Sequence, residues 1–476
     1  MGIIGISCYF HDSAAALISN DGEILAAVQE ERFSRKKFDS RFPFCSLDYC
    51  LKIAKEKNID VEKYIYYEKP IRVFMRLLET YFSTAPRGLS SFMPAMETWI
   101  GEKIFTKQNL VDEILLIDEK FTEDKLFFSE HHLSHAASAF YPSPFDESLV
   151  LCLDAVGEWA TTTAWHGKGK DLKPLWEINF PHSIGMLYSA FTYYCGFKVN
   201  SGEYKLMGLA PYGKPIYVDL ILKHLVELKE DGSILINQDY FSYLDGSVMT
   251  NEKFAKLFGG PARKPETKIT KREMDLASSI QKVTEKIIFN MASYTKKLTG
   301  SENLCLSGGV ALNCVANGHL MKSNLFKDIW IQPASGDAGS SLGCAYDAYF
   351  SYFNNERLLG ENNSSLQSGS LLGPSWTKSE IQSFLHSADA KYNYYANNNE
   401  KNKIIAKKIK DGKVVGLFLG RSEFGPRALG SRSIIGDPRN KDMQARLNLK
   451  IKFRESFRPF APAILQEKTK SYFELE

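Results

Sequence analysis

The chain has 476 residues, of which 44% are hydrophobic and 24% are charged. This composition is typical of a soluble globular protein, and the length predicts two or three domains. No apolar stretch is long enough to span a bilayer, and the N-terminus does not read as a secretory leader. Eight cysteines form no Cys-x-x-Cys pair, and several lie in apolar runs. We therefore expect reduced, mostly buried thiols in a cytoplasmic protein.

Positive charge is concentrated at the C-terminal end of the chain. Residues 401–476 hold 18 Lys or Arg and 8 Asp or Glu, a balance of +10, whereas the whole chain carries +3. A basic terminal segment favours an anionic ligand, either phosphate groups or nucleic acid. The alternative, a solvated basic face, is preferred for residues 401–413.

A pattern of three short strands occurs twice. In the first copy, residues 3–9, 13–19 and 23–31 are apolar runs, separated by a turn containing His11 and Asp12 and by the hairpin turn Asn20-Asp21-Gly22. The same pattern returns at residues 149–178, shifted by 147 positions. Two such units, each followed by helical sequence, predict two related α/β lobes with a cleft between them.

The rest of the chain alternates helical and strand-like segments. Residues 45–125 are predicted to be mostly helical, and residues 273–298 form a long amphipathic helix. Two strand–glycine turn–helix units follow, a geometry that can bind phosphate at the helix N-terminus. We place a polar linker at 354–374 between a first domain of residues 1–353 and a second α/β domain of residues 375–476.

A histidine pair indicates a metal site. His131 and His135 are four positions apart in a run predicted to be helical, so both imidazoles share one helix face, a spacing that suits a divalent metal. Asp154 ends a predicted strand and Asp337 lies in a glycine turn, so both could complete the site. A turn or cap role is an equally good interpretation for these carboxylates, and His132 is interpreted as structural.

Three further segments carry polar residues between glycines. The turn Ser307-Gly308-Gly309 would let a nucleotide approach the backbone closely. In the segment 201–213, Glu203 and Lys205 are predicted to alternate on an extended strand, where ligand binding and a surface ion pair fit equally well. The segment 420–433 holds Arg421, Arg427 and Arg432, whose guanidinium groups match phosphate.

Taken together, these motifs resemble the NodU/TobZ-type O-carbamoyltransferases. The resemblance runs from about Ile3 to Phe473. The motifs that carry it, in the family's order, are YFHDSAAAL, EERFSRKK, HHLSHAASAF, EYKLMGLAPYG, LSGGVALNCVAN, SGDAGSSLG and GRSEFGPRALGSRSI. It implies an N-terminal Kae1-like domain of the actin/hexokinase/Hsp70 fold, with two lobes and duplicated βββ units, and a C-terminal YrdC-like α/β domain.

The resemblance also implies an activity, which is carbamoyl transfer in two steps. The YrdC-like domain would join carbamoyl phosphate and ATP into carbamoyladenylate, and the Kae1-like domain would transfer the carbamoyl group to a hydroxyl of a small natural product. The implied metal is iron. The implied residues are His131, His135, Asp154 and Asp337 for the metal; His11, Asp12 and Lys37 for catalysis; Glu203, Lys205, Gly208, Gly308, Gly309, Asn313 and Asn317 for the nucleotide; and Arg421, Arg427, Arg432, Ser433, Arg454 and Arg458 for the phosphates.

The sequence also departs from the family pattern. Lys37-Phe38-Asp39 stands where the family has Lys-His-Asp. The last family segments of the YrdC-like domain have no counterpart before Glu476. We therefore expect a shortened second domain: either the chain is a fragment, or its adenylation step is impaired or needs a second chain. Alternatives are a threonylcarbamoyl transferase acting on tRNA, a sugar kinase and a non-catalytic nucleotide-binding protein. The predicted partners are ATP, carbamoyl phosphate, a hydroxyl acceptor and a possible second copy of the chain, with nucleic acid disfavoured and no membrane.

Overall fold

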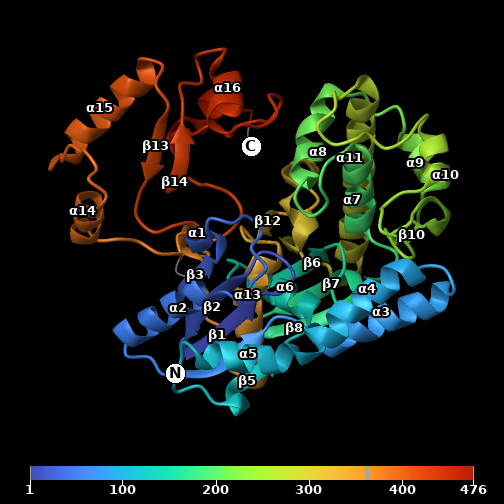
Figure 1. Ribbon diagram of the computed structural model, residues 1–476, viewed down its shortest axis with the longest axis horizontal. Helices are drawn as coiled ribbons and strands as arrows, with labels where there is room; N and C mark the ends of the chain where they lie inside the picture. Colours follow the sequence, from blue (N-terminus) through green and yellow to red (C-terminus); the bar gives the residue numbers. More distant parts are fainter. Residues whose placement is uncertain (1, 361–363, 475–476) are drawn as a thin grey trace. The chain divides into compact units, whose positions relative to one another are not determined.

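The computed structural model describes residues 2–360 and 364–474 and separates into two compact units (Figure 1). Unit 1 comprises Met1–Ser375 together with Arg421–Arg427, and unit 2 comprises Trp376–Gly420 together with Ala428–Glu476. Part of the predicted linker, residues 361–363, lies outside the described residues. The following stretch packs into unit 1, because Leu366 donates its backbone N–H to the carbonyl of Pro142 and Leu372 is only 2% exposed.

The first sheet of unit 1 has the order β3-β2-β1-β4-β5. Every residue of its first three strands is buried, which requires cover on both faces of the sheet. The three strands pair antiparallel, whereas the later two join in parallel. The strands are β1 (Gly2–Ser7), β2 (Ala14–Ser19), β3 (Ile24–Gln29), β4 (Val61–Tyr66) and β5 (Leu126–Phe128).

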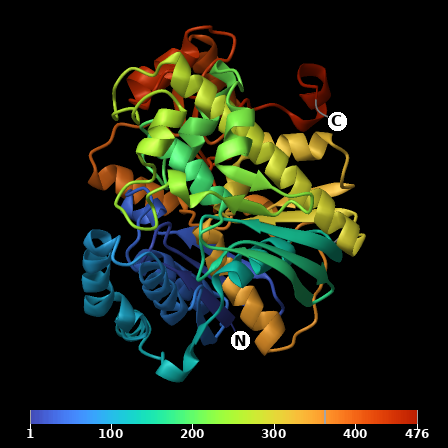
Figure 2. The ribbon, with the colours of Figure 1, turned by 90° about the vertical axis from the view of Figure 1, so that its right-hand side faces the viewer.

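The second sheet repeats this plan with the order β12-β11-β6-β7-β8. Its first three strands again pair antiparallel and stand side by side in Figure 2, and its last two again add in parallel. The predicted α/β fold with duplicated βββ units is confirmed. The strands are β6 (Glu147–Leu153), β7 (Ala160–Lys168), β8 (Asp171–Asn179), β11 (Asn303–Ser307) and β12 (Asp328–Ile331).

Helices cover both sheets of unit 1. The longest is α11 (Lys271–Thr299), which begins at a capping box made by Thr270 and Glu273 and ends at Gly300 in the left-handed conformation. A short pair, β9 (Val226–Leu228) and β10 (Ile234–Ile236), lies outside the two sheets. The other helices are α1 (Glu31–Ser34), α2 (Phe44–Glu56), α3 (Pro70–Thr84), α4 (Leu89–Gly101), α5 (Thr106–Leu115), α6 (His131–Phe140), α7 (Ile184–Tyr194), α8 (Glu203–Leu209), α9 (Val218–His224), α10 (Glu252–Leu257), α12 (Cys314–Lys322) and α13 (Asp337–Asp347).

Unit 2 is a smaller α/β unit. Its strands β13 (Val415–Phe418) and β14 (Arg432–Ile435) form an antiparallel pair. Its helices are α14 (Lys378–Ser387), α15 (Asn398–Lys410), α16 (Met443–Arg446) and α17 (Thr469–Tyr472).

The segment 421–427 lies between the two stretches of unit 2 along the sequence, but it packs into the core of unit 1. Phe424 is fully buried there, and its backbone N–H donates to the carbonyl of Ser370. The next residue, Gly425, donates its N–H to the side chain of Gln29 at the end of β3. Unit 1 is therefore completed by residues that lie more than 40 positions beyond its main stretch.

Two further expectations concern the cysteine thiols and membrane-spanning helices. All eight cysteines lie in the described part of the chain and are free, six of them buried and two, Cys45 and Cys314, exposed. Among the described residues, no helix is both long and apolar enough to cross a membrane.

Candidate metal centre and its surroundings

The candidate site forms where α6 crosses α13. His131 and His135 lie one turn apart on α6, and Asp337 is the first residue of α13. The two helices approach so closely that a Cβ on Gly343 would lie 1.7 Å from the carbonyl oxygen of Ser134. Only glycine permits this contact, and the close crossing brings the start of α13 beside the two histidines.

Asp154, which directly follows β6, completes a group of four ligand-type side chains. This candidate metal-ligand group consists of His131, His135, Asp154 and Asp337. Nε2 of His131 lies 3.2 Å from Oδ2 of Asp154 and 3.8 Å from Oδ1 of Asp337. Nε2 of His135 lies 3.8 Å and 3.5 Å from the same two oxygens. The four donor atoms all lie within 4.8 Å of one another. The structure thus brings together all four residues that the sequence predicts as ligands.

The donor set fits a divalent cation. Two ligands at about 2.1 Å from one ion, at angles between 90° and 110°, stand about 3.0–3.4 Å apart, close to the shorter distances found here. Nε2 of His135 and Oδ2 of Asp337 are buried and have no hydrogen-bond partner among the described residues. Buried polar atoms without partners are costly, so a cation that accepts these lone pairs explains the arrangement.

The charges of this group are strongly coupled. Burial alone would lower the pKa of His131, but the carboxylates of Asp154, Glu68 and Asp337 raise the pKa well above its usual value. For Asp154, burial works toward a higher pKa, yet the nearby histidines hold its pKa well below the usual range. The site therefore strongly favours ionised carboxylates, the form that binds a cation.

Sequence reasoning missed the residues that contact the three histidines of α6. Ser340 lies 3.2 Å from Nδ1 of His135, and Glu68 lies 3.6 Å from Nδ1 of His131. Glu158 accepts the backbone N–H of His131 at 2.9 Å and so binds the N-terminus of α6. Thr163 contacts the imidazole of His132, whose pKa burial lowers to about 3. Such contacts fix ring orientation, but no spacing in the sequence signals them.

His11 faces the same group from the turn after β1. Its Nε2 lies 3.7 Å from Oδ2 of Asp337, and its Nδ1 lies 3.0 Å from the carboxylate of Asp12. Burial lowers its pKa, but the carboxylates of Asp337 and Asp12 outweigh this effect and raise the pKa to about 9. Lys37, the third predicted catalytic residue, is exposed and lies over the ring of Phe38.

The glycine turn after β11 contacts the metal-ligand group. Gly308 has a φ of +86°, and a Cβ there would lie 2.3 Å from the carbonyl oxygen of Leu153. Gly309 donates its N–H to Oδ1 of Asp154 at 3.1 Å. The side chain of Asn313 pairs with Gln281, and that of Asn317 donates to the carbonyl of Ala311. Binding of a nucleotide by these residues stays a prediction.

The expectation of an extended segment at Glu203 and Lys205 is wrong. These residues begin helix α8, which also contains Gly208, and residues two apart on a helix do not face one side. The carboxylate of Glu203 accepts the hydroxyl of Ser189 and the backbone N–H groups of Asn200 and Gly202, so it closes the loop before the helix. Local hydrogen bonding at the helix start outweighed the alternating pattern.

The predicted phosphate-binding arginines are divided between the two units. In unit 1, Arg421 donates to the carbonyls of Gly373 and Leu25, and Arg427 lies over the ring of Tyr204. In unit 2, Arg432 stacks on Phe418 at 3.5 Å and donates to the carbonyl of Leu419. The remaining unit 2 contacts are as follows: Ser433 accepts the N–H of Gly430, Arg454 donates to Asn448, and Arg458 pairs with Glu455.

Comparison with known proteins identifies the family. A family model described as carbamoyltransferase N-terminus matches residues 2–346, and one described as carbamoyltransferase C-terminus matches residues 406–476. The chain belongs to the carbamoyltransferase family. The metal-ligand group lies wholly within the segment that matches the N-terminal description.

Several relatives of this carbamoyltransferase are much longer. An uncharacterised protein of Synechocystis sp. is 56% identical over 478 residues, covering 100% of this chain and 77% of the relative. The nodulation protein NolNO of Sinorhizobium fredii is 34% identical over 98% of this chain, and NolO of Bradyrhizobium diazoefficiens is 36% identical over 72% of it. The chain spans 64% and 60% of the length of these two nodulation proteins.

Two solved structures show a remote likeness to this chain. Component A of (R)-2-hydroxyglutaryl-CoA dehydratase from Acidaminococcus fermentans aligns with a TM-score of 0.37 and 12% identity, over 74% of this chain and 98% of that one. HypF of T. kodakarensis aligns with a TM-score of 0.36 and 13% identity, over 77% and 49%.

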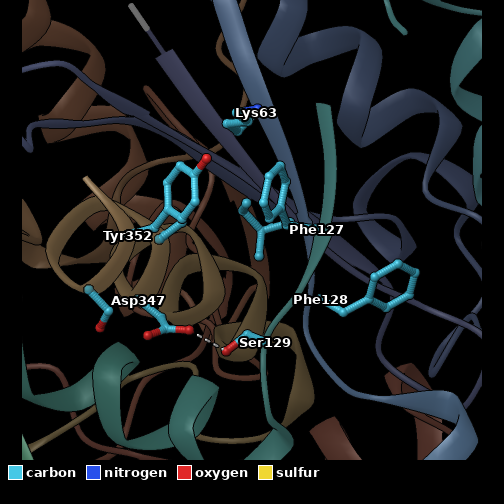
Figure 3. A pocket seen from close by; sticks show the side chains of 9 residues that line it. Lys63, Phe127, Phe128, Ser129, Asp347 and Tyr352 are labelled. Carbon is cyan, nitrogen blue, oxygen red and sulfur yellow. Dashed lines mark hydrogen bonds between the residues drawn. The ribbon is translucent and has the colours of Figure 1, made fainter. Parts of the chain in front are cut away.

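The carbamoyltransferase also has a small cavity at the outer strand β5, with a volume of about 170 Å³ (Figure 3). Among its lining residues, Ser129 donates a hydrogen bond of 2.7 Å to Asp347, whose pKa is raised by burial. Lys63, which also lines the cavity, lies over the ring of Phe127. None of the four metal-ligand residues lines this cavity, so it is separate from the candidate site.

Proposed function

We propose that this carbamoyltransferase activates carbamoyl phosphate with ATP and one water as carbamoyladenylate, releasing phosphate and pyrophosphate, and transfers the carbamoyl group to a hydroxyl of a small-molecule acceptor. The observation that carries the proposal is the group His131, His135, Asp154 and Asp337 with His11 facing it. The matches to both halves of the family support the carbamoyl chemistry. A sugar kinase would need only carboxylates for magnesium, so the histidine pair argues against that alternative.

The four ligand residues would hold a divalent cation, with iron as the expected metal, and Ser340 and Glu158 would keep their side chains in place. When bound, the cation supplies Lewis-acid polarisation of a carbamoyl or phosphate oxygen. His131 and His135 are 2% exposed or less, and electrostatic interactions are stronger at such buried positions than in water.

His11 would act on the acceptor. Asp12 binds its Nδ1, which leaves Nε2 directed toward the site. Among the groups that raise the pKa of His11, Asp337 has the largest effect, so a cation held by Asp337 would lower that pKa and leave Nε2 free to take the hydroxyl proton. The acceptor oxygen then bonds to the carbamoyl carbon, the bond between that carbon and the AMP phosphate oxygen breaks, and AMP leaves with the electron pair. Arg421, Arg427, Arg432, Ser433, Arg454 and Arg458 are proposed to bind phosphate groups in the activation step.

The activation step is tested by pyrophosphate release from ATP, measured with and without carbamoyl phosphate and with and without ferrous iron. Release that depends on carbamoyl phosphate is expected. If the folded chain releases none, the activation half of the proposal is wrong, and transfer is then measured separately from synthetic carbamoyladenylate.

The transfer step is tested with His11→Asn. Transfer of the carbamoyl group from synthetic carbamoyladenylate to a panel of hydroxyl compounds should fall by about 100-fold or more, as for loss of a general base, while pyrophosphate release is kept. His166→Asn is the matched control, because His166 pairs with Glu147 at the surface of β7. Equal loss of both steps in His11→Asn would contradict the assigned role.

A further inference from the structure

An apolar helical hairpin of unit 1 lacks the cover that its sequence requires. Helices α3 and α4 lie side by side, with Tyr81 stacked on Phe92 at 3.9 Å and Phe74 against Trp99 at 5.4 Å (Figure 1). The pairing of an early residue of one helix with a late residue of the other shows that the helices run antiparallel. Of the 15 residues of α3 and the 13 of α4, only Thr84 and Met96 are buried.

Each helix carries a stripe of large apolar residues with spacings of four, three and four. This is the spacing of a seam that packs against another helix. Six of the eight stripe residues are exposed, including Phe82 at 71% and Met93 at 59%, whereas Leu78 is half-buried and Met96 is buried. The stripe residues are Ile71, Met75, Leu78 and Phe82 on α3, and Leu89, Met93, Met96 and Ile100 on α4.

Both stripes lie on the same side of the hairpin. On α3 the stripe begins three positions before the contact residue Phe74, and on α4 it begins three positions before the contact residue Phe92. On each helix the stripe is therefore turned by the same angle, in the same sense about the helix axis, away from the residues that contact the other helix. Because the two helices run in opposite directions, these equal turns bring both stripes to the same side of the hairpin. The hairpin therefore presents one continuous apolar face.

The size of this face matches a protein interface. Ile71, Met75, Phe82, Leu89, Met93 and Ile100 are each about half exposed or more, as is Phe105 in the adjoining turn, where Ile104 is 39% exposed. At about 200 Å² for a fully exposed large side chain, this amounts to roughly 800 Å². A typical monomer exposes a largest patch of about 300–600 Å², whereas each partner of a stable complex contributes about 800 Å².

We propose that this face is a homodimer interface, in which the α3–α4 hairpins of two copies pack face to face as a four-helix bundle. A four-helix bundle consists of two helix pairs, each with one apolar side that faces the other pair. In a dimer with a two-fold axis, both pairs can be the same hairpin, because the same face of each copy then contacts the other. The exposed charges of the hairpin are mixed, with Arg72 and Arg87 against Glu79, Glu97 and Glu102. A lipid surface would instead favour a basic rim, so the charge pattern supports a second copy.

The start of the same hairpin lies close to the metal-ligand group. The residue before α3, Lys69, donates its backbone N–H to Glu158, which also binds the backbone N–H of His131. Arg76 on α3 donates to the carbonyl of Gly157. Pairing of two hairpins would therefore steady the segment that holds the N-terminus of α6. The interface itself rests on the exposed face alone and does not depend on the proposed function.

The test is sedimentation velocity on the full chain over about 1 to 50 µM, which covers the weak end of the micromolar-to-picomolar affinities of standard-size interfaces. The unchanged chain should sediment as a dimer, and Met93→Glu should weaken dimerisation by about tenfold or more, since the charge would be buried at the interface. Met321→Glu is the matched control, because Met321 is 55% exposed on helix α12 and lies outside the face. It should leave the dimer intact.

Circular dichroism of each variant confirms folding, and Met75→Gln on α3 serves as a milder second variant if Met93→Glu unfolds. A monomer at 50 µM for the unchanged chain overturns the proposal, as does a dimer that survives both Met93→Glu and Met75→Gln. Co-sedimentation of a monomeric chain with vesicles of phosphatidylcholine and phosphatidylglycerol would overturn it in favour of a lipid surface.

Discussion

Oδ2 of Asp154 lies 3.2 Å from Nε2 of His131, although 23 residues separate the two along the chain. The contact joins the end of strand β6 to the first turn of helix α6. Asp154 also accepts the N–H of Gly309 through its other oxygen, so its carboxylate is fixed by two elements. A side chain bound in this way cannot move far to suit a ligand, so the site is preorganised for the proposed cation.

Removing one of the histidine ligands should abolish metal binding. His135→Ala deletes a donor atom that is buried and unpartnered among the described residues, and we expect metal content to fall from about one ion per chain to near none. Metal analysis by mass spectrometry after loading with ferrous iron under argon measures this. His166→Ala should retain the metal; equal metal content in both variants would mean that the four residues do not form the site.

The turn after β11 should tolerate only glycine. Gly308→Ala places a Cβ against the backbone of Leu153 in a conformation with positive φ, and should cost about 1–3 kcal/mol of unfolding free energy. Gly318→Ala lies inside helix α12 with open space around its Cβ, so it should stabilise the chain by about 0.5–1 kcal/mol. Urea unfolding measures both, and a stable Gly308→Ala variant would contradict the geometry.

The segment 421–427 should be essential for the stability of unit 1. Phe424→Ala empties a fully buried position and should destabilise unit 1 by about 3–5 kcal/mol. Phe384→Ala, on helix α14, removes a ring that is 68% exposed and should change stability little. Hydrogen exchange, which resolves the two units separately, should show faster exchange in β3 for Phe424→Ala only; unchanged protection there would exclude a core role.

His182 should contribute to loss of stability in mild acid. Burial lowers its pKa, and its Nδ1 accepts the backbone N–H of Ile236 in the neutral form. The unfolded chain therefore binds more protons below about pH 6.5, so this contribution is present above that pH and is lost as the pH falls through the lowered folded value.

His182→Gln keeps an acceptor for Ile236 but cannot titrate. Its melting temperature should fall less between pH 7 and pH 5 than that of the unchanged chain, while the two should be similar at pH 7.5. His319→Gln, at an exposed position, serves as the control. Parallel pH profiles for His182→Gln and the unchanged chain would remove His182 from the acid response.

The sequence by itself determined the elements and the ligand types. Alternating and apolar runs follow from the periods of strands and helices, so the two βββ units and the long helix α11 were predictable. The spacing of His131 and His135 placed both rings on one helix face, and the quoted motifs indicated the family. These features depend on residues close together in the chain, where local backbone geometry decides the outcome.

Only the tertiary structure decided which distant residues meet. Ser340 reaches His135 because α6 crosses α13 at Gly343, whereas Glu68 and Glu158 reach His131 from the loops that follow β4 and β6. No local pattern encodes these contacts. In the same way, Glu203 begins a helix because Ser189 and two backbone N–H groups bind its carboxylate. The core of unit 1 includes Phe424 for a related reason. Burial of its large apolar ring stabilises the fold even though this segment lies far along the sequence from the rest of unit 1. These contacts depend on how helices and strands pack against one another, so the spacing of residues in the sequence does not predict them.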